Sequence, residues 1–305
     1  MFKFNKVLLV VGITSVLCLV YWSLVPRSLR PHQGYNVRSY GFTLKRLQEA
    51  YDLESIDILI LGSSKAYRHF DTRFLEKKGY LAVNLGTSSQ TPNESLWLYS
   101  KYVNQLRPKI VIIEVDPLLL SSDGVESTCD LISNFPLNET GELVLRNKSF
   151  IVLNTYLYRK FTELFLDYSK LNQSGTDNLD TYIPGGFVQR KFTSFWRASV
   201  HSHVNVIKSD QIRELKALYD WVKFSGSEVY LVRTPVTKIR HLNEENTLDF
   251  DSTMVAIAGD HYMNYVEQIE LQDSIHFYDD KHMNQKGVEL FMSSFMGTFE
   301  KYLPH

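Results

Sequence analysis

The chain has 305 residues, of which 44% are hydrophobic and 22% are charged, so a disordered or collagen-like protein is excluded. Lys and Arg number 33 against 34 Asp and Glu, and a formal net charge of −1 argues against nucleic-acid binding. The two cysteines, Cys18 and Cys129, argue against a disulfide framework or a Cys-based zinc site. The sequence predicts neither a metal site nor a bound cofactor.

The first predicted element is an N-terminal transmembrane helix within residues 1–25. Val7 to Val25 is a run of 19 residues without a charge, close to the roughly 20 residues that cross a bilayer core as a helix. Tyr21 and Trp22 lie near its far end, where aromatic residues favour the membrane interface. A cleaved signal peptide is the alternative, but this run is longer than a usual signal and no A-x-A-like site follows it.

Flanking charges bear on the orientation of this anchor. Lys3 and Lys6 favour a cytoplasmic N-terminus, although Arg27 and Arg30 flank the other side equally. We expect a single-pass protein whose main domain is extracytoplasmic. Residues 26–50 are predicted as a stalk and a first amphipathic helix, and residues 51–305 as the main domain.

The main domain alternates short apolar runs with helical patterns. The predicted strands are Ile56–Leu61, Ala82–Leu85, Lys109–Val115, Glu228–Arg233 and Ser274–Tyr278. The predicted helices are Asp71–Lys78, Asn93–Gln105, Asp210–Phe224, Ser252–Ile269 and Asn284–Tyr302. Such alternation predicts an α/β fold, a three-layer sandwich with a mainly parallel sheet covered on both faces.

The pattern loosens between residues 118 and 206, where aromatic residues are dense and Pro184-Gly185-Gly186 marks a turn. We expect an inserted, mostly helical region here. It could form one wall of a substrate cleft or serve only for packing, and the sequence does not decide between these roles.

Three segments follow predicted strands, and sites in parallel α/β sheets form at the carboxyl ends of strands. Gly62-Ser63-Ser64-Lys65-Ala66 follows the first strand, where a serine is either a nucleophile or a helix N-cap. Gly86 follows the second strand, where its N–H could face a ligand or the residue could simply form a tight turn.

The third segment, residues 279–287, lies before the last helix. It contains Asp279 three residues before His282, a spacing that lets the carboxylate hold one imidazole nitrogen while the other accepts a proton from serine. A polar loop with Asn284 as a helix cap is the alternative.

The order of these blocks, Ser then Gly then Asp-x-x-His, resembles the SGNH (GDSL-like) hydrolase superfamily. It resembles most the membrane-anchored DltD-like and alginate-acetylation-like branch, in which the first block reads G-S-S. The resemblance covers residues 55–117 and 228–302. It implies an SGNH, flavodoxin-like fold in which Ser64 is the nucleophile, Asp279 and His282 complete the triad, and the Ser64 and Gly86 N–H groups hold the oxyanion.

Two further residues are candidates for oxyanion or substrate binding. Asp116 stands where the family has an asparagine donor, and an ionised carboxylate only accepts hydrogen bonds. Another donor must replace the asparagine, or activity is low. Arg233 could bind an anionic or carbonyl group, although such arginines more often form structural ion pairs. A G-x-S-x-G elbow of another hydrolase fold is disfavoured because Asp279 is adjacent to His282.

The predicted function is a membrane-anchored, extracytoplasmic serine esterase or O-acyltransferase. The resemblance implies acyl groups on an envelope or secreted polysaccharide, with an acylated polysaccharide or acyl donor and a membrane acyltransferase as candidate partners. The alternative is a non-catalytic anchored module that binds glycan or acts as a scaffold for such an acyltransferase.

Overall fold

The computed structural model describes residues 2–26, 40–165, 167, 170, 173–196, 201–202 and 204–302. Residues 27–39 of the predicted stalk lie outside the described residues. The helix predicted after the stalk is present as α2 (Thr43–Tyr51).

A five-stranded parallel sheet forms the centre of the molecule. Its strands are β1 (Ile58–Leu61), β2 (Ala82–Asn84), β3 (Ile110–Glu114), β6 (Glu228–Arg233) and β7 (Tyr262–Asn264). Their order across the sheet is β2-β1-β3-β6-β7, and every pairing is parallel. This is the flavodoxin-like order, so the predicted α/β class with a mainly parallel sheet is confirmed. The strand order reverses between β1 and β3, which is where such sheets place their sites.

The prediction of the fifth strand is wrong. Residues 274–278 begin in a short helix, α13 (Asp273–His276), and the fifth strand is β7. The range 252–269, predicted as one helix, holds the end of α12 (Thr247–Ala258), the 3₁₀ turn η5 (Gly259–His261) and then β7. Residues 274–278 are a short apolar run, which periodicity alone does not assign to helix or strand, and β7 has only three residues.

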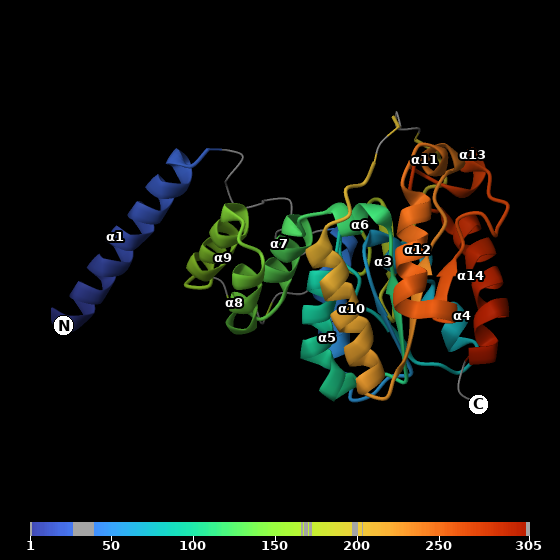
Figure 1. Cartoon of the computed structure of the whole chain (residues 1–305). Helices are drawn as coiled ribbons and strands as arrows, with labels where there is room; N and C mark the ends of the chain where they lie inside the picture. The colour runs from blue at the N-terminus through green and yellow to red at the C-terminus, as the bar shows by residue number, and fades with distance from the viewer. Residues whose placement is uncertain are drawn as a thin grey trace.

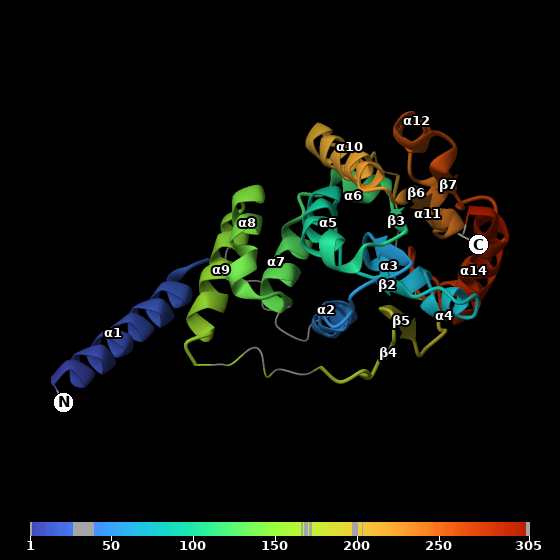
Figure 2. The same cartoon turned by 90° about the horizontal axis from the view of Figure 1, so that it is seen from below.

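Alternate strand residues pack into two separate cores. Leu59, Val111 and Leu231 face one side, against α5 (Pro92–Leu106), α10 (Ser209–Phe224) and α12. The neighbouring strand residues face the other side, against α3 (Ser64–His69), α4 (Thr72–Glu76) and α14 (Gln285–Phe299). Figure 2 shows α5 and α10 on one side of the sheet and α4 and α14 on the other. This is the predicted three-layer arrangement.

The insertion after β3 contains helices and one hairpin. The helices are α6 (Pro117–Ser121), α7 (Val125–Asn134), α8 (Leu137–Arg146) and α9 (Phe150–Thr162). They are followed by the antiparallel pair β4 (Asp180–Ile183) and β5 (Phe187–Arg190), whose connection is the predicted turn at residues 184–186. Figure 1 shows α7, α8 and α9 at one end of the α/β core, toward α1 (Phe2–Leu24).

The C-terminal end of α1 contacts α9. The ring of Trp22 packs against the rings of Tyr158 and Phe161, with centroids 5.2 and 5.3 Å away. The hydroxyl of Tyr21 donates to Asn154 Oδ1 at 2.8 Å. Across the described residues, no helix combines the length and apolar character needed to cross a membrane.

Candidate active site

Ser64 is the first residue of α3, directly after the turn that ends β1. Gly62 makes this turn with a φ of +141°, and a Cβ at this position would lie 2.6 Å from Cβ of Glu114. A side chain there would therefore clash with β3, and glycine lets the two strands end close together. Ser63 caps α3 by accepting the N–H of Lys65, which leaves the hydroxyl of Ser64 free for other contacts.

The structure brings Ser64, His282 and Asp279 together in one chain of hydrogen bonds. Ser64 Oγ lies 2.8 Å from His282 Nε2, although the two residues are 218 positions apart. His282 Nδ1 lies 2.8 Å from Asp279 Oδ2. The arrangement has the hydroxyl–imidazole–carboxylate geometry of a nucleophile, its base and the group that orients the base.

The segment that holds His282 is a tight loop before α14. An isolated bridge joins Phe277 to Met283, and the N–H of Tyr278 donates to the carbonyl of His282. Asp279 Oδ1 accepts the N–H groups of Lys281 and His282 at 2.9 and 2.7 Å. The loop's own backbone thus fixes the carboxylate beside the imidazole.

The same loop leads into α14 through Asn284, whose side chain accepts the N–H groups of Lys286 and Gly287. The alternative role of Asn284 as a helix cap therefore holds alongside the triad geometry.

Burial sets the charge states of the pair. It lowers the pKa of His282 below 6.5 and outweighs the opposite effect of Asp279. Burial acts to raise the pKa of Asp279, but the hydrogen bond and charge of His282 hold it well below its usual range. At neutral pH His282 is therefore a neutral base beside an ionised carboxylate. The ring of Tyr278 stacks on His282 with centroids 5.6 Å apart.

A second histidine supports this loop and was not recognised in the sequence. His69, fully buried at the end of α3, accepts the N–H of Met283 through Nε2 at 3.1 Å. Its Nδ1 lies 2.9 Å from Thr234 Oγ1, so the ring bridges β6 and the loop. Burial lowers the pKa of His69 well below its ordinary value, which keeps the ring neutral. Only the position of His69 five residues after Ser64 could have suggested this contact.

The β4–β5 hairpin is fastened to α3 by a buried ion pair. Arg68 donates two hydrogen bonds to Asp180, at 3.1 and 2.9 Å, and Arg190 donates a third. The guanidinium groups of Arg68 and Arg190 also lie over the ring of Tyr278, 5.7 and 4.5 Å from its centroid. The hairpin therefore braces the residue that stacks on His282. Arg68 thus has a structural role.

Gly86 lies where the sequence expects it, against the Ser64 turn. A Cβ there would lie 2.8 Å from Cβ of Ala66 and 2.9 Å from the carbonyl oxygens of Gly62 and Ser63. Its N–H, however, donates to Asn84 Oδ1 at 3.0 Å. The contacts thus explain the glycine by close packing, while its N–H is already engaged within the turn.

Asp116 is buried at the end of β3 and paired with a lysine. Its Oδ2 accepts a hydrogen bond from Lys65 Nζ, and its Oδ1 accepts the N–H of Leu118. The same ammonium lies 3.3 Å from Glu114 Oε1, and Glu114 Oε2 accepts the N–H and hydroxyl of Ser63. Burial acts to raise the pKa of Asp116, but the charge of Lys65 holds it well below its usual range.

The structure does not support Arg233 as a ligand for substrate. Its side chain is buried, and its guanidinium lies 3.0 Å from Glu244 and 3.1 Å from Asp251. Both acids follow β6 in sequence: Asp251 lies on α12, and Glu244 lies in the segment before it. A cation at a strand end is as suited to this internal pairing as to ligand binding, so sequence alone could not separate the two.

A small pocket opens beside Ser64. Its lining residues are Ser63, Ser64, Lys65, Ser89, Asp116, Leu118, Leu119, Arg240 and Lys281. Of the insertion, only Leu118 and Leu119 are among them. Within the described residues, no group of three or more His, Cys, Asp or Glu side chains could hold a metal ion.

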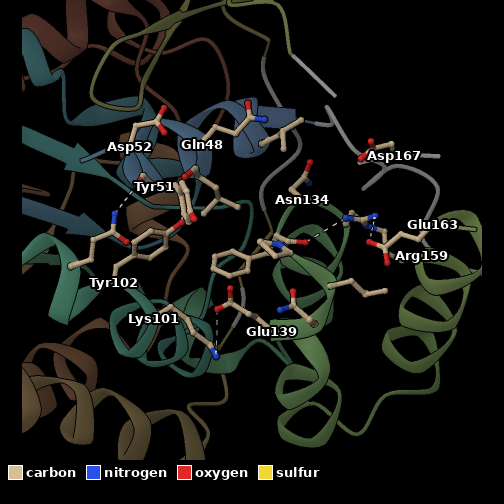
Figure 3. A pocket seen from close by; sticks show the side chains of 18 of the residues that line it. Gln48, Tyr51, Asp52, Lys101, Tyr102, Asn134, Glu139, Arg159, Glu163 and Asp167 are labelled. Atoms are coloured by element: carbon tan, nitrogen blue, oxygen red, sulfur yellow. Dashed lines mark hydrogen bonds and ion pairs between the residues drawn. The ribbon is translucent and has the colours of Figure 1, made fainter. Parts of the chain in front are cut away.

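A larger cavity of about 1100 Å³ lies elsewhere, between α2, α5, α8 and α9. Figure 3 shows Tyr51, Tyr102, Arg159 and Glu163 around it, and none of the triad residues is among its lining residues. Ser64 lines the small pocket and not this cavity.

No family model and no curated protein sequence matches the chain. Among solved structures, a GDSL-like lipase from Bacteroides thetaiotaomicron is 11% identical, with 87% of this chain and 100% of that chain covered and a TM-score of 0.44. A psychrotrophic esterase EstA from Pseudoalteromonas sp., inhibited by monoethylphosphonate, is 15% identical, with 82% and 98% covered and a TM-score of 0.39. An assignment of activity must rest on the site geometry, not on these distant similarities.

Proposed function

We propose that the protein is a serine esterase or O-acyltransferase of the SGNH type. The observation that carries the proposal is the chain of two hydrogen bonds, each 2.8 Å long, from Ser64 through His282 to Asp279. The loop bonds to Asp279 and the His69 bond to Met283 hold this chain in place. A buried neutral imidazole is what a general base needs at neutral pH.

In the proposed reaction, Ser64 Oγ attacks the carbonyl carbon of an ester while its proton moves to His282 Nε2. The tetrahedral intermediate collapses, the bond to the leaving alkoxide breaks, and His282 returns the proton to that oxygen. The acyl group is then held on Ser64. Attack by water completes hydrolysis, whereas attack by a sugar hydroxyl completes acyl transfer.

Labelling with a serine-directed fluorophosphonate tests this proposal. The wild-type protein should be labelled, and Ser64→Ala should abolish labelling. The hydroxyl of Ser63 is engaged by Glu114, so Ser63→Ala is the matched control and should still be labelled at Ser64. A folded wild-type protein that takes up no label would instead support the non-catalytic module. The engaged N–H of Gly86, together with the carboxylate of Asp116 in place of a donor, favours that alternative.

The finer parts of the proposal rest on the sequence. The uncharged run from Val7 to Val25 supports a membrane anchor, and Lys3 and Lys6 before it support a cytoplasmic N-terminus. The resemblance to the membrane-anchored SGNH branch supports acyl groups of an envelope or secreted polysaccharide as substrate. Incubating the protein with an O-acetylated polysaccharide and measuring Ser64-dependent acetate release tests that class. Unchanged acetate in the presence of an active enzyme would contradict it.

A further inference from the structure

A serine hydrolase needs hydrogen-bond donors aimed at the carbonyl oxygen, because that oxygen becomes negatively charged in the transition state. Close to Ser64 these donors are scarce. The N–H of Ser64 itself makes no hydrogen bond that the structure records among the described residues, so it is one available donor. The N–H of Gly86 is engaged by Asn84, and the carboxylate of Asp116 only accepts.

We propose that the ammonium group of Lys65 is an oxyanion donor, which makes Lys65 a further catalytic residue of the reaction proposed above. Lys65 follows Ser64 directly, and both residues line the same pocket with Asp116. An ammonium group carries three N–H donors. Asp116 accepts one of them, and Glu114 Oε1 lies 3.3 Å away as an ion-pair partner without a hydrogen bond, so donors remain for a ligand in the pocket.

The surroundings of Lys65 suit this task. Its side chain is only 5% exposed and is held from two sides by carboxylates that are themselves buried. Such a donor is preorganised, because its position is set before the substrate binds. The pairing with Lys65 also accounts for the presence of Asp116 in an oxyanion site, because the ammonium shields the developing negative charge from the Asp116 carboxylate.

The remaining cations of the pocket are less suited to this role. Arg240 is paired with Asp280 at 2.8 Å and with Glu244 at 3.3 Å. Lys281 is half-buried and makes no side-chain contact that the structure records among the described residues. The matched control is Lys109, whose ammonium lies in a 2.8 Å ion pair outside this pocket.

The test compares single and double variants in the hydrolysis of p-nitrophenyl acetate, with the full chain in detergent. Lys65→Met should lower kcat/KM by about 100-fold, the typical effect of losing one oxyanion donor. Lys109→Met should stay within about threefold of the wild type, since it removes an ion-paired lysine but no donor in the pocket. A Lys65→Met variant that folds and retains activity within the same range would overturn the proposal.

Two double variants test whether Lys65 acts as a hydrogen-bond donor or only neutralises the charge of Asp116. In Lys65→Met/Asp116→Asn the amide oxygen can still accept the Leu118 N–H, and the amide NH₂ replaces Oδ2, which faces Lys65 Nζ. This variant should recover about tenfold over Lys65→Met because it regains a donor. Lys65→Met/Asp116→Leu has the same net charge but no donor and should recover nothing. Equal recovery of activity over Lys65→Met in both double variants would show that Lys65 only neutralises Asp116, and would refute the assignment.

This comparison remains decisive if the single Lys65 variant does not fold, because both double variants lack the unpaired charge of Asp116. Thermal melts verify that the double variants fold. The inference rests on the proposed function, but the two can fail separately. A wild-type protein without Ser64-dependent turnover overturns both. If the wild-type protein shows such turnover and Lys65→Met shows it at the same rate, the inference alone fails.

Discussion

His282 is the residue whose charge should govern the rate. It acts as a base only when neutral, and burial lowers its pKa below 6.5 despite the carboxylate of Asp279. We therefore expect kcat/KM to rise with pH along one acid limb, with an apparent pKa below 6.5, and then to reach a plateau by neutral pH. Initial rates of ester hydrolysis between about pH 4 and 9 measure this limb.

Asp279→Asn provides the control for that profile. The amide carries no negative charge, so it no longer holds the Nδ1–H of His282 or stabilises the protonated ring in the same way. We therefore expect kcat to fall by about 10⁴-fold. A limb centred above pH 7 in the wild type would contradict the buried environment of His282. An unchanged rate in Asp279→Asn would contradict its role as the orienting group.

His69 should matter as a positioning residue. It accepts from the N–H of Met283 and bonds Thr234, so His69→Phe would leave a buried donor without a partner at a cost of about 1–3 kcal/mol. We expect kcat to fall by roughly tenfold because the loop that carries His282 shifts, with little change in KM.

His69→Gln offers the matched rescue, since an amide can both accept from Met283 and donate to Thr234. Its kcat should recover toward the wild type, while thermal melts follow stability separately. If His69→Phe and His69→Gln lose the same activity, the ring is needed for packing and not for these two hydrogen bonds.

At the scale of elements, the β4–β5 hairpin depends on one buried carboxylate. Asp180 accepts from Arg68 and Arg190 while its side chain is only 8% exposed. Asp180→Asn would leave the buried Arg68 without its counter-charge, which costs about 3–5 kcal/mol for pairs of this kind. The melting temperature should fall, and limited proteolysis should cut within residues 174–196 sooner than in the wild type.

A surface ion pair provides the comparison for Asp180. Asp220 pairs with Lys216 on α10, where both side chains are largely exposed. Asp220→Asn should change stability by less than about 1 kcal/mol. Equal losses in the two variants would mean that the Asp180 contacts do not fasten the hairpin.

The elements that the sequence predicted are those with a strong local pattern. The strands around Ile58, Ile110 and Val229 have buried, apolar interiors because both faces are covered, and this property is visible in the sequence. β7 was not predicted, since its three residues gain their strand geometry from pairing with β6 and not from a pattern of their own.

The contacts of the site also divide into local ones, which the sequence predicts, and long-range ones, which it does not. Asp279 and His282 are three residues apart, so their contact could be predicted from a loop of that length. The contact of His69 with Met283 joins residues 214 positions apart, and the Arg68–Asp180 pair spans 112. Such contacts form only once the order of the strands in the sheet is fixed, and no local sequence pattern predicts them. The two roles left open for Arg233 could not be separated for this reason, because its acidic partners were not identifiable from the sequence.

At the scale of the whole molecule, the proposed anchor predicts where the protein resides. α1 presents exposed apolar side chains, among them Ile13 and Val16, which are 52% and 59% exposed. An acidic residue at the centre of a membrane-spanning helix costs about 2.5–3.5 kcal/mol. We therefore expect Ile13→Asp/Val16→Asp to move the protein from carbonate-washed membranes to the soluble fraction.

The matched control places two acids on an exposed apolar part of α12. Leu248 and Val255 are 80% and 53% exposed and lie on the α/β core. Because a charge at these positions meets water and not lipid, Leu248→Asp/Val255→Asp should stay with the membranes as the wild type does. The anchor proposal fails if the wild-type protein is recovered in the soluble fraction, or if both double variants leave the membrane alike. The contacts of Trp22 with Tyr158 and Phe161 would then remain as helix packing alone.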